Sequence, residues 1–179
     1  ECNESVEVLQ GQGPADVRKL TIHLASVLLQ SSGLAPTFEA AQSKARERID
    51  SGAALELFRM MIEQQGGSYQ EQLGLAPNRE VLWEGESGVV EAIDGETIGN
   101  TVISLGGGRR KKGEAIDPSV GIRMKVGIGA ELEAGQPIAE VFTHSSAHFE
   151  AAAIAIRNSI RTTLETPDPF QLIREPPPN

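Results

Sequence analysis

The chain has 179 residues, of which 39% are hydrophobic and 23% are charged, which is the composition of a globular protein with a core. Its 25 acidic and 16 basic residues give a formal charge of -9, which disfavours binding to nucleic acid or to an anionic membrane over most of the surface. The one cysteine, Cys2, excludes an internal disulfide. No apolar run approaches the roughly 20 residues that cross a bilayer.

These properties predict a cytoplasmic protein that binds neither nucleic acid nor a membrane. The chain begins with Glu1 and not with Met, and its first residues lack the charged, apolar and small-residue pattern of a signal peptide. We therefore interpret the chain as a piece of a longer protein.

Three helices are expected in the first 65 residues, over 14–32, about 37–49 and about 53–65, each followed by a glycine. The first carries apolar side chains three and four residues apart, on one helical face: Val17, Leu20, Leu24, Val27 and Leu28. The same spacing occurs in the other two helices, at Phe38, Ala41, Ala45 and Ile49 and at Leu55, Phe58, Met61 and Ile62.

After Pro77 the sequence changes to short bursts of valine and isoleucine separated by glycine, which predict strands within 79–93, 115–127 and 136–144. A short helix is expected over 96–105, closed by Gly106 to Gly108, and a last helix over 145–164. The predicted fold class is therefore α+β. N-terminal helices precede a turn-rich hinge at 66–78 and a module with an antiparallel or mixed sheet.

The stretch "SLGGGRRKKG", residues 104–113, has the glycine spacing of a nucleotide-binding P-loop. Glu114 and Ala115 follow where that loop needs a lysine and a hydroxyl, so P-loop chemistry is excluded. Two interpretations remain. The backbone N–H groups and the arginines of the basic run 109–112 could bind an anion, or the glycines end a helix and lead into a solvated basic turn. We favour the second.

The segment "VGIGAELEAGQPIAEV", residues 126–141, has a glycine rhythm typical of biotinyl and lipoyl carrier barrels. Those carriers bear their cofactor on a lysine, and Lys125 is the candidate here. In the carriers the lysine follows this segment, whereas Lys125 precedes it. A barrel-like scaffold without a cofactor is therefore the better interpretation.

No catalytic constellation is visible in the sequence. His144 and His148 are four residues apart and would share one face of a helix, but no third metal ligand stands at a telling spacing, so His23, His144 and His148 are expected to be structural or on the surface. Cys2 has no partner motif. Leu132 stands where the third glycine of a dinucleotide-binding motif belongs.

Residues 105–122, "LGGGRRKKGEAIDPSVGI", resemble without gaps the G-G-G-R-x-x-x-x-x-x-I-D-x-S-V-G signature of thymidine and pyrimidine-nucleoside phosphorylases. The upstream "SGAALELFRMMIEQQGG", the "SGVVEAID" before the signature and the "GAELEAGQPIAEV" after it resemble the same family in the same order. The resemblance covers effectively the whole chain. It implies that 1–73 is a helical remnant of a larger α/β domain. It also implies that 79–175 is the C-terminal α+β domain, with barrel-sandwich (hammerhead-like) character.

The start of the chain resembles the family's G-N-x-L-E-x-x-E segment without its first four residues, so that Glu1 and Glu4 are its two glutamates. In relatives that bind a monovalent cation near the phosphate, the second glutamate is a ligand, which corresponds to Glu4. The companion carbonyl ligands would lie upstream. The resemblance implies no other cofactor.

The family cleaves thymidine, or uridine too, with inorganic phosphate to give the base and a (deoxy)ribose 1-phosphate, and it forms homodimers through a small α domain. The residues that bind phosphate and pyrimidine lie in the portion before Glu1. The resemblance thus implies a nucleoside-salvage pentosyltransferase whose main catalytic residues this chain lacks, so the chain alone is predicted to be inactive. The alternatives are a carrier module with a cofactor on Lys125 and a stand-alone anion-binding domain built on 109–112.

Overall fold

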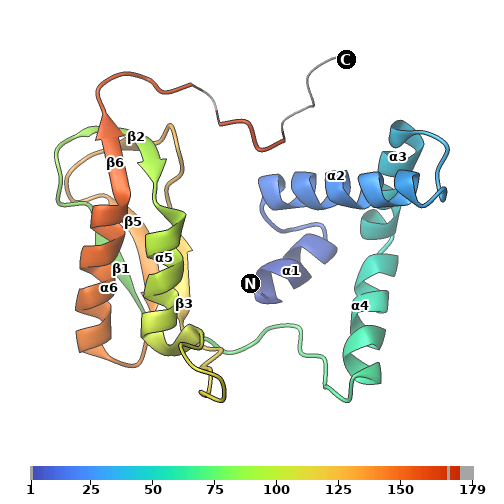
Figure 1. Ribbon diagram of the computed structural model, residues 1–179, viewed down its shortest axis with the longest axis horizontal. Helices are drawn as coiled ribbons and strands as arrows, with labels where there is room; N and C mark the ends of the chain where they lie inside the picture. Colours follow the sequence, from blue (N-terminus) through green and yellow to red (C-terminus); the bar gives the residue numbers. More distant parts are fainter. Residues whose placement is uncertain (1, 169, 174–179) are drawn as a thin grey trace. The chain divides into compact units, whose positions relative to one another are not determined.

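The computed structural model describes residues 2–168 and 170–173, so the expectations for Glu1 and for the proline-rich tail from 174 onward lie outside the described residues. The described chain divides into two compact units, one of residues 2–73 with 171–173 and one of residues 74–168 with 170 (Figure 1). Each unit is described by itself below.

Residues 2–73 form a unit of helices only, and the three helices expected from the spacing are confirmed. The four helices are α1 (Cys2–Leu9), α2 (Ala15–Ser31), α3 (Phe38–Asp50) and α4 (Ala53–Gln64). Local signals set their ends. The Thr37 hydroxyl accepts a hydrogen bond from the Ala40 N–H at the start of α3, and Gly52 adopts a left-handed conformation (φ 78°) between α3 and α4.

The contact between α2 and α3 buries little apolar surface. Its buried cluster consists of Ile22, Ala45 and Ile49, and beside it the small Ser26 is fully buried and bonds back to the Ile22 carbonyl. The apolar stripe that the sequence places on α2 lies elsewhere. Leu24 is 54% exposed and Leu28 is 70% exposed. The helix is as predicted, but the second half of its predicted apolar stripe stays exposed, whereas Val17 and Leu20 are half-buried.

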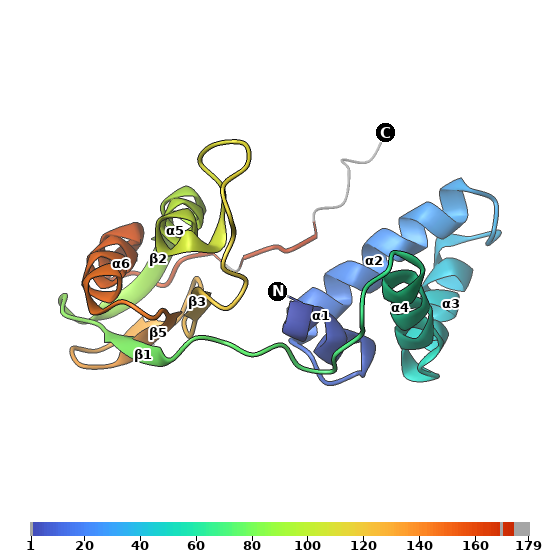
Figure 2. The same cartoon turned by 90° about the horizontal axis from the view of Figure 1, so that it is seen from below.

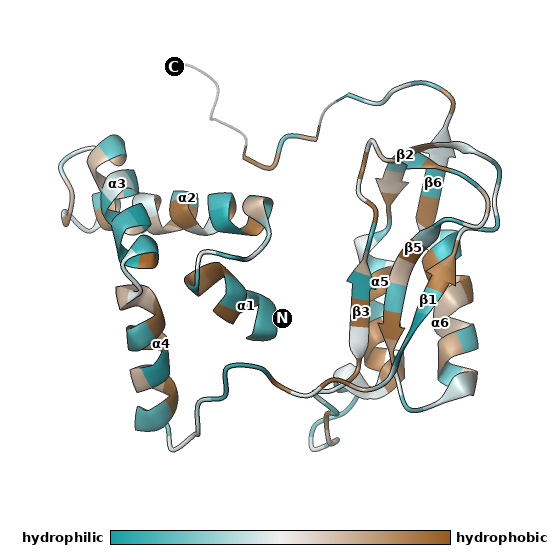
Figure 3. Ribbon diagram, turned by 180° about the vertical axis from the view of Figure 1, so that it is seen from behind, coloured by the Kyte–Doolittle hydropathy of each residue, from teal (hydrophilic) through white to brown (hydrophobic). Residues whose placement is uncertain are grey.

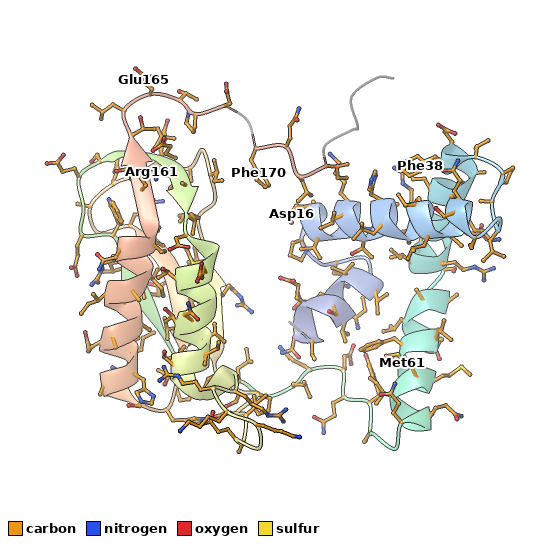
Figure 4. The ribbon with its side chains drawn as sticks, in the orientation of Figure 1. Asp16, Phe38, Met61, Arg161, Glu165 and Phe170 are labelled. Carbon is orange, nitrogen blue, oxygen red and sulfur yellow. The ribbon has the colours of Figure 1, made fainter. Side chains whose placement is uncertain are left out.

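Helix α4 also has its apolar side only partly covered, with Leu55, Phe58 and Ile62 half-buried. None of its side chains is buried, and Met61, labelled in Figure 4, is 47% exposed. Hydrophobic residues lie along both α2 and α4 when the ribbon is coloured by hydropathy (Figure 3). Residues 2–73 therefore form regular helices that pack around only a small core.

Residues 74–168 and 170 form an α+β unit with two antiparallel sheets. One sheet has the strand order β1-β5-β3, from β1 (Asn78–Leu82), β5 (Pro137–Phe142) and β3 (Gly121–Met124). The other has the order β4-β2-β6, from β4 (Glu131–Leu132), β2 (Gly88–Ile93) and β6 (Ile160–Thr163). The helical elements are α5 (Gly95–Val102), its short wider continuation η1 (Ile103–Gly107) and α6 (Ser146–Ser159).

Helices α5 and α6 lie side by side over one face of the first sheet (Figures 1 and 2). Strand β2 leads directly into α5, and α6 leads directly into β6. The β2–β6 pair therefore links the N-terminus of α5 to the C-terminus of α6. One core fills the space between these elements. It includes the fully buried side chains of Val81, Val90, Ile138, Val141 and Ile156.

The expected last helix over 145–164 is too long. Helix α6 ends at Ser159, and residues 160–163 form β6, which pairs antiparallel with β2. Ile160 is buried in the strand as it would be in a helix, so apolar spacing alone does not separate the two structures. The β-branched side chains of Ile160, Thr162 and Thr163 favour the strand, which satisfies the backbone groups of β2.

The α+β class is confirmed, with antiparallel sheets. In the described residues the two sheets are separate three-stranded ladders, and barrel-sandwich character stays a prediction. None of the helices within 2–168 and 170–173 is long and apolar enough to cross a membrane.

Candidate functional site

The signature turn, residues 104–121, begins within η1 and ends at the first residue of β3. Gly106 has a φ of 104°, a conformation that L side chains rarely adopt, and a Cβ on Gly107 would come within 2.8 Å of the Val102 side chain. The Asp117 N–H then donates to the Gly106 carbonyl at 3.0 Å, which closes the turn on the helix end. The expected helix end at Gly106 is thus confirmed. The glycines are needed there because the backbone takes a positive φ at Gly106 and packs closely on the helix at Gly107.

The basic run 109–112 is organised by the residue that excluded a P-loop. One carboxylate oxygen of Glu114 accepts from the backbone N–H of Arg110 at 2.7 Å and from that of Lys111 at 3.1 Å. The Arg109 Nε donates to the Glu114 carbonyl at 2.9 Å. The position that a bound phosphate would take in front of two backbone N–H groups is therefore held by a carboxylate of the chain itself.

Asp117 and Ser119 form a second hydrogen-bonded group in the turn. Asp117 Oδ1 accepts from the Ser119 hydroxyl at 2.6 Å and from the Ser119 N–H at 2.9 Å. These bonds, with a smaller contribution from the charge of His144, hold the pKa of the Asp117 carboxyl below its usual value. The His144 Nε2 lies 3.3 Å from the Ser119 hydroxyl and 3.8 Å from Asp117 Oδ2.

This group resembles the serine, histidine and aspartate of a nucleophilic triad in composition only. In a triad the histidine accepts the serine proton and the aspartate holds the histidine. Here the Ser119 hydroxyl donates to the aspartate at 2.6 Å, so it is committed to the carboxylate and fixes the turn. From the sequence, Asp117 and Ser119 were identified only as positions of the family signature, and no role was predicted for them. The Asp-Pro-Ser pattern, which favours a side-chain-to-backbone turn, was the signal available.

The structure disfavours Lys125 as a cofactor-bearing residue. Its backbone N–H donates to the Ile138 carbonyl and extends the β3–β5 ladder, so Lys125 is not at a free hairpin tip. Its ammonium lies 2.6 Å from a Glu80 oxygen and 3.2 Å from a Glu140 oxygen. The hydrogen bonds to Glu80 and then to Glu140 raise the pKa of Lys125, which opposes the neutral amine that acylation needs.

The two C-terminal histidines do not share a helix face. His144 precedes Ser145, the N-cap of α6, whereas His148 lies in the first turn of the helix. His23 packs edge-on against the ring of Phe38 with 5.2 Å between ring centroids, in agreement with a structural role. Among residues 2–168 and 170–173, no three His, Cys, Asp or Glu side chains form a group that could hold a metal ion.

Glu4 and Cys2 lie on α1. Glu4 is in the first turn of the helix, and both side chains are exposed. A single exposed carboxylate does not make a cation site, because monovalent and divalent cations need several oxygen ligands. Glu4 alone therefore does not make the cation site that the resemblance implies, and that site stays a prediction.

Two hollows of the described α+β unit are lined mostly by residues with structural roles. One of about 540 Å³ is an open depression along the β2–β6 pair, lined among others by Asp94, Asn158 and Arg161. Asp94 there caps α5, and Arg161, labelled in Figure 4, is paired with Glu91 at 2.7 Å. A second, of about 130 Å³, lies between α6 and the α5–η1 segment, and it is lined by three alanines of α6 together with Thr101, Ser104, Leu105 and His148.

Fold and site together define an α+β module whose characteristic turn is self-paired and structural. The family described as "Pyrimidine nucleoside phosphorylase C-terminal domain" matches residues 89–163. The first and last matched residues, Val89 and Thr163, are direct partners in the β2–β6 ladder, so the match encloses a closed structural unit.

Two curated relatives match most of the chain. A thymidine phosphorylase of Burkholderia cenocepacia is 36% identical over an alignment of 162 residues, which covers 86% of this chain and 36% of the relative. A thymidine phosphorylase of Mesorhizobium japonicum is 34% identical over an alignment of 163 residues, which covers 87% of this chain and 37% of the relative. The chain thus spans a little over a third of each relative. It belongs to the pyrimidine nucleoside phosphorylase family and contains the C-terminal domain of that family.

Proposed function

We propose that this chain is the C-terminal part of a thymidine or pyrimidine-nucleoside phosphorylase. The full-length protein would cleave thymidine, or uridine, with inorganic phosphate and release the base and a (deoxy)ribose 1-phosphate, as a pentosyltransferase of nucleoside salvage. The observation that carries the proposal is the identity of 36% and 34% to two thymidine phosphorylases over 86% and 87% of this chain.

The reaction needs phosphate held beneath the anomeric carbon and positive charge near the leaving pyrimidine, which is positioning and electrostatics. In the proposal those groups come from the portion before Glu1, and residues 74–170 serve as a structural module. The internal pairing of the signature turn supports this division, because Glu114 and Asp117 bind groups of the turn itself.

Residues 1–73 are proposed to be the helical part of a larger α/β domain. The exposed apolar stripe of α2, with Leu24 at 54% and Leu28 at 70% exposure, supports this assignment, since such a stripe needs a cover in a folded protein. In the proposal a sheet outside this chain covers it, and a small α domain outside this chain forms a homodimer in the cytoplasm.

Glu4 is proposed as one ligand of a monovalent cation in the full-length protein, and no other cofactor is proposed. The carboxylate is exposed at the start of α1, so it is free to contribute an oxygen atom to a site completed by other residues. No step of the reaction is assigned to the cation here.

The test is a phosphorolysis assay on the full-length protein and on this chain alone. The full-length protein is expected to release thymine from thymidine only when phosphate is present, whereas this chain alone releases none. Uridine in place of thymidine then measures the preference for the sugar and base. A full-length protein without phosphate-dependent cleavage of any nucleoside contradicts the proposal, and activity of this chain alone contradicts the placement of the catalytic groups.

A further inference from the structure

The basic turn 109–114 contains two converging backbone N–H groups that could also bind an external anion. Two neighbouring backbone N–H groups, those of Arg110 and Lys111, point at one carboxylate oxygen of Glu114. Converging N–H groups of this kind form an anion-binding concavity. The chain reverses at Gly113 (φ 91°), and the Glu114 N–H donates to the Lys111 carbonyl, which keeps the carboxylate in front of the two donors.

The charges around this concavity exceed what one carboxylate neutralises. Four cationic side chains stand in a row from Arg109 to Lys112 on a chain with a formal charge of -9. The Arg110 guanidinium donates to the neutral hydroxyl of Ser104 at 2.8 Å. In the part of the chain that the structure describes, no carboxylate forms an ion pair with any of the four.

The carboxylate can also leave without disturbing the core. Residues 109–114 are all exposed, so the Glu114 side chain has only its own hydrogen bonds to lose when it swings into solvent. A phosphate group carries up to two charges and three or more acceptor oxygens, against one charge and two oxygens for Glu114. It therefore suits two N–H groups within a run of four cationic residues better than the resident carboxylate does.

We propose that the turn 109–114 is a binding site for a phosphate group, in which the Glu114 carboxylate is a built-in competitor that occupies the two backbone N–H groups when no ligand is bound. The site lies in the C-terminal domain, and the proposal does not depend on the catalytic activity of the full-length protein. The ligand is free inorganic phosphate or the phosphate of a small sugar ester.

The test is a titration of the isotope-labelled chain followed through the amide resonances of Arg110 and Lys111. Inorganic phosphate and ribose 5-phosphate are added separately, with chloride at matched ionic strength as the reference. Both amides are expected to shift saturably with at least one of the two ligands. The ligand that binds more tightly identifies the source of the phosphate group.

Removing the competitor gives the decisive comparison. Glu114→Ala is expected to bind the preferred ligand about tenfold more tightly than the unchanged chain. In the variant the ligand no longer has to displace a carboxylate that is hydrogen-bonded to the two N–H groups. Glu133→Ala removes the same charge from another exposed turn of this unit and is expected to leave the affinity unchanged. Glu114→Gln keeps the shape of the side chain and should also bind more tightly, which covers the case in which alanine disorders the turn.

Three results would overturn the site. Shifts that chloride reproduces at equal ionic strength, or that do not saturate, indicate diffuse screening only. Equal affinities of Glu114→Ala and Glu133→Ala indicate a general charge effect. An affinity of Glu114→Gln no greater than that of the unchanged chain shows that the carboxylate does not compete for the N–H groups.

Discussion

Helix α6 in residues 74–170 presents Ile156 to a core in which this side chain is fully buried, whereas the side chains of helix α4 in residues 2–73 are at most half-buried. Both helices have apolar residues at helical spacing. The difference is that two sheets and a second helix give α6 surfaces to pack on. Helix α4, in contrast, makes few contacts, mainly with α1 and α3. An apolar face therefore predicts that a helix packs against another apolar surface. It does not predict that this surface belongs to the same unit of the chain.

The largest expected effect is on protease resistance. Chymotrypsin is expected to cleave within residues 2–73 about tenfold faster than within 78–163, because Leu24, Leu28 and Met61 are exposed on helices that pack on only a small core. Mass spectrometry of the digest measures the two rates. Chymotrypsin is preferable to trypsin, which would cut the exposed basic run 109–112 inside the stable unit. Equal rates would contradict the comparison.

Ile156→Ala tests the core of the second unit directly. It should reduce the free energy of unfolding by about 2–5 kcal/mol, since it leaves a cavity at a fully buried position. Urea denaturation followed by Trp83 fluorescence measures it, because Trp83 is the one tryptophan of the sequence and is buried in this core. Ile154→Ala on the same helix is the matched control, since Ile154 is 58% exposed and its loss should change little.

Acid should affect the second unit through the cap of α5. The hydrogen bond from the Thr97 hydroxyl, followed by backbone N–H bonds, lowers the pKa of Asp94. A carboxyl with a lowered folded pKa contributes stability that is present above its unfolded pKa of about 3.9 and is lost as the pH falls through the folded value. Asp94→Asn keeps the cap without a titrating group.

Trp83 denaturation curves between neutral pH and pH of about 3 should therefore show a smaller loss of stability in Asp94→Asn than in the unchanged chain. An identical pH dependence of the two proteins would show that the cap does not titrate in this range. Glu133→Gln, at an exposed turn of the same unit, controls for the loss of one acidic charge.

The smallest effect is expected at the α2 stripe. Leu28→Ala should change the free energy of unfolding of residues 2–73 by no more than about 0.5 kcal/mol, because the side chain is 70% exposed. Circular dichroism at 222 nm measures this loss of helix separately from the Trp83 signal. A loss of several kcal/mol would mean that this face is packed in the isolated chain.

The sequence predicted helices α2, α3 and α4 of the first unit but not α1. The ends of the predicted helices depend on local chemistry, such as the Thr37 cap and the glycine at 52. It also predicted that Gly106 ends a helix, since only the backbone conformation decides this. For the last helix it was wrong over 160–163. Ile160 is buried in either structure, and the strand exists only because β2 offers backbone partners from 70 residues earlier in the chain.

The same distinction holds for the signature turn. By itself the sequence determined that Glu114 and Ala115 exclude a P-loop, and that the letters around them belong to a phosphorylase-like signature. Only the tertiary structure decided that Glu114 accepts the N–H groups of Arg110 and Lys111, and that Asp117 holds Ser119 beside His144. Caps and turns arise from neighbouring residues, whereas the pairing of side chains and the burial of a face depend on which distant surfaces meet.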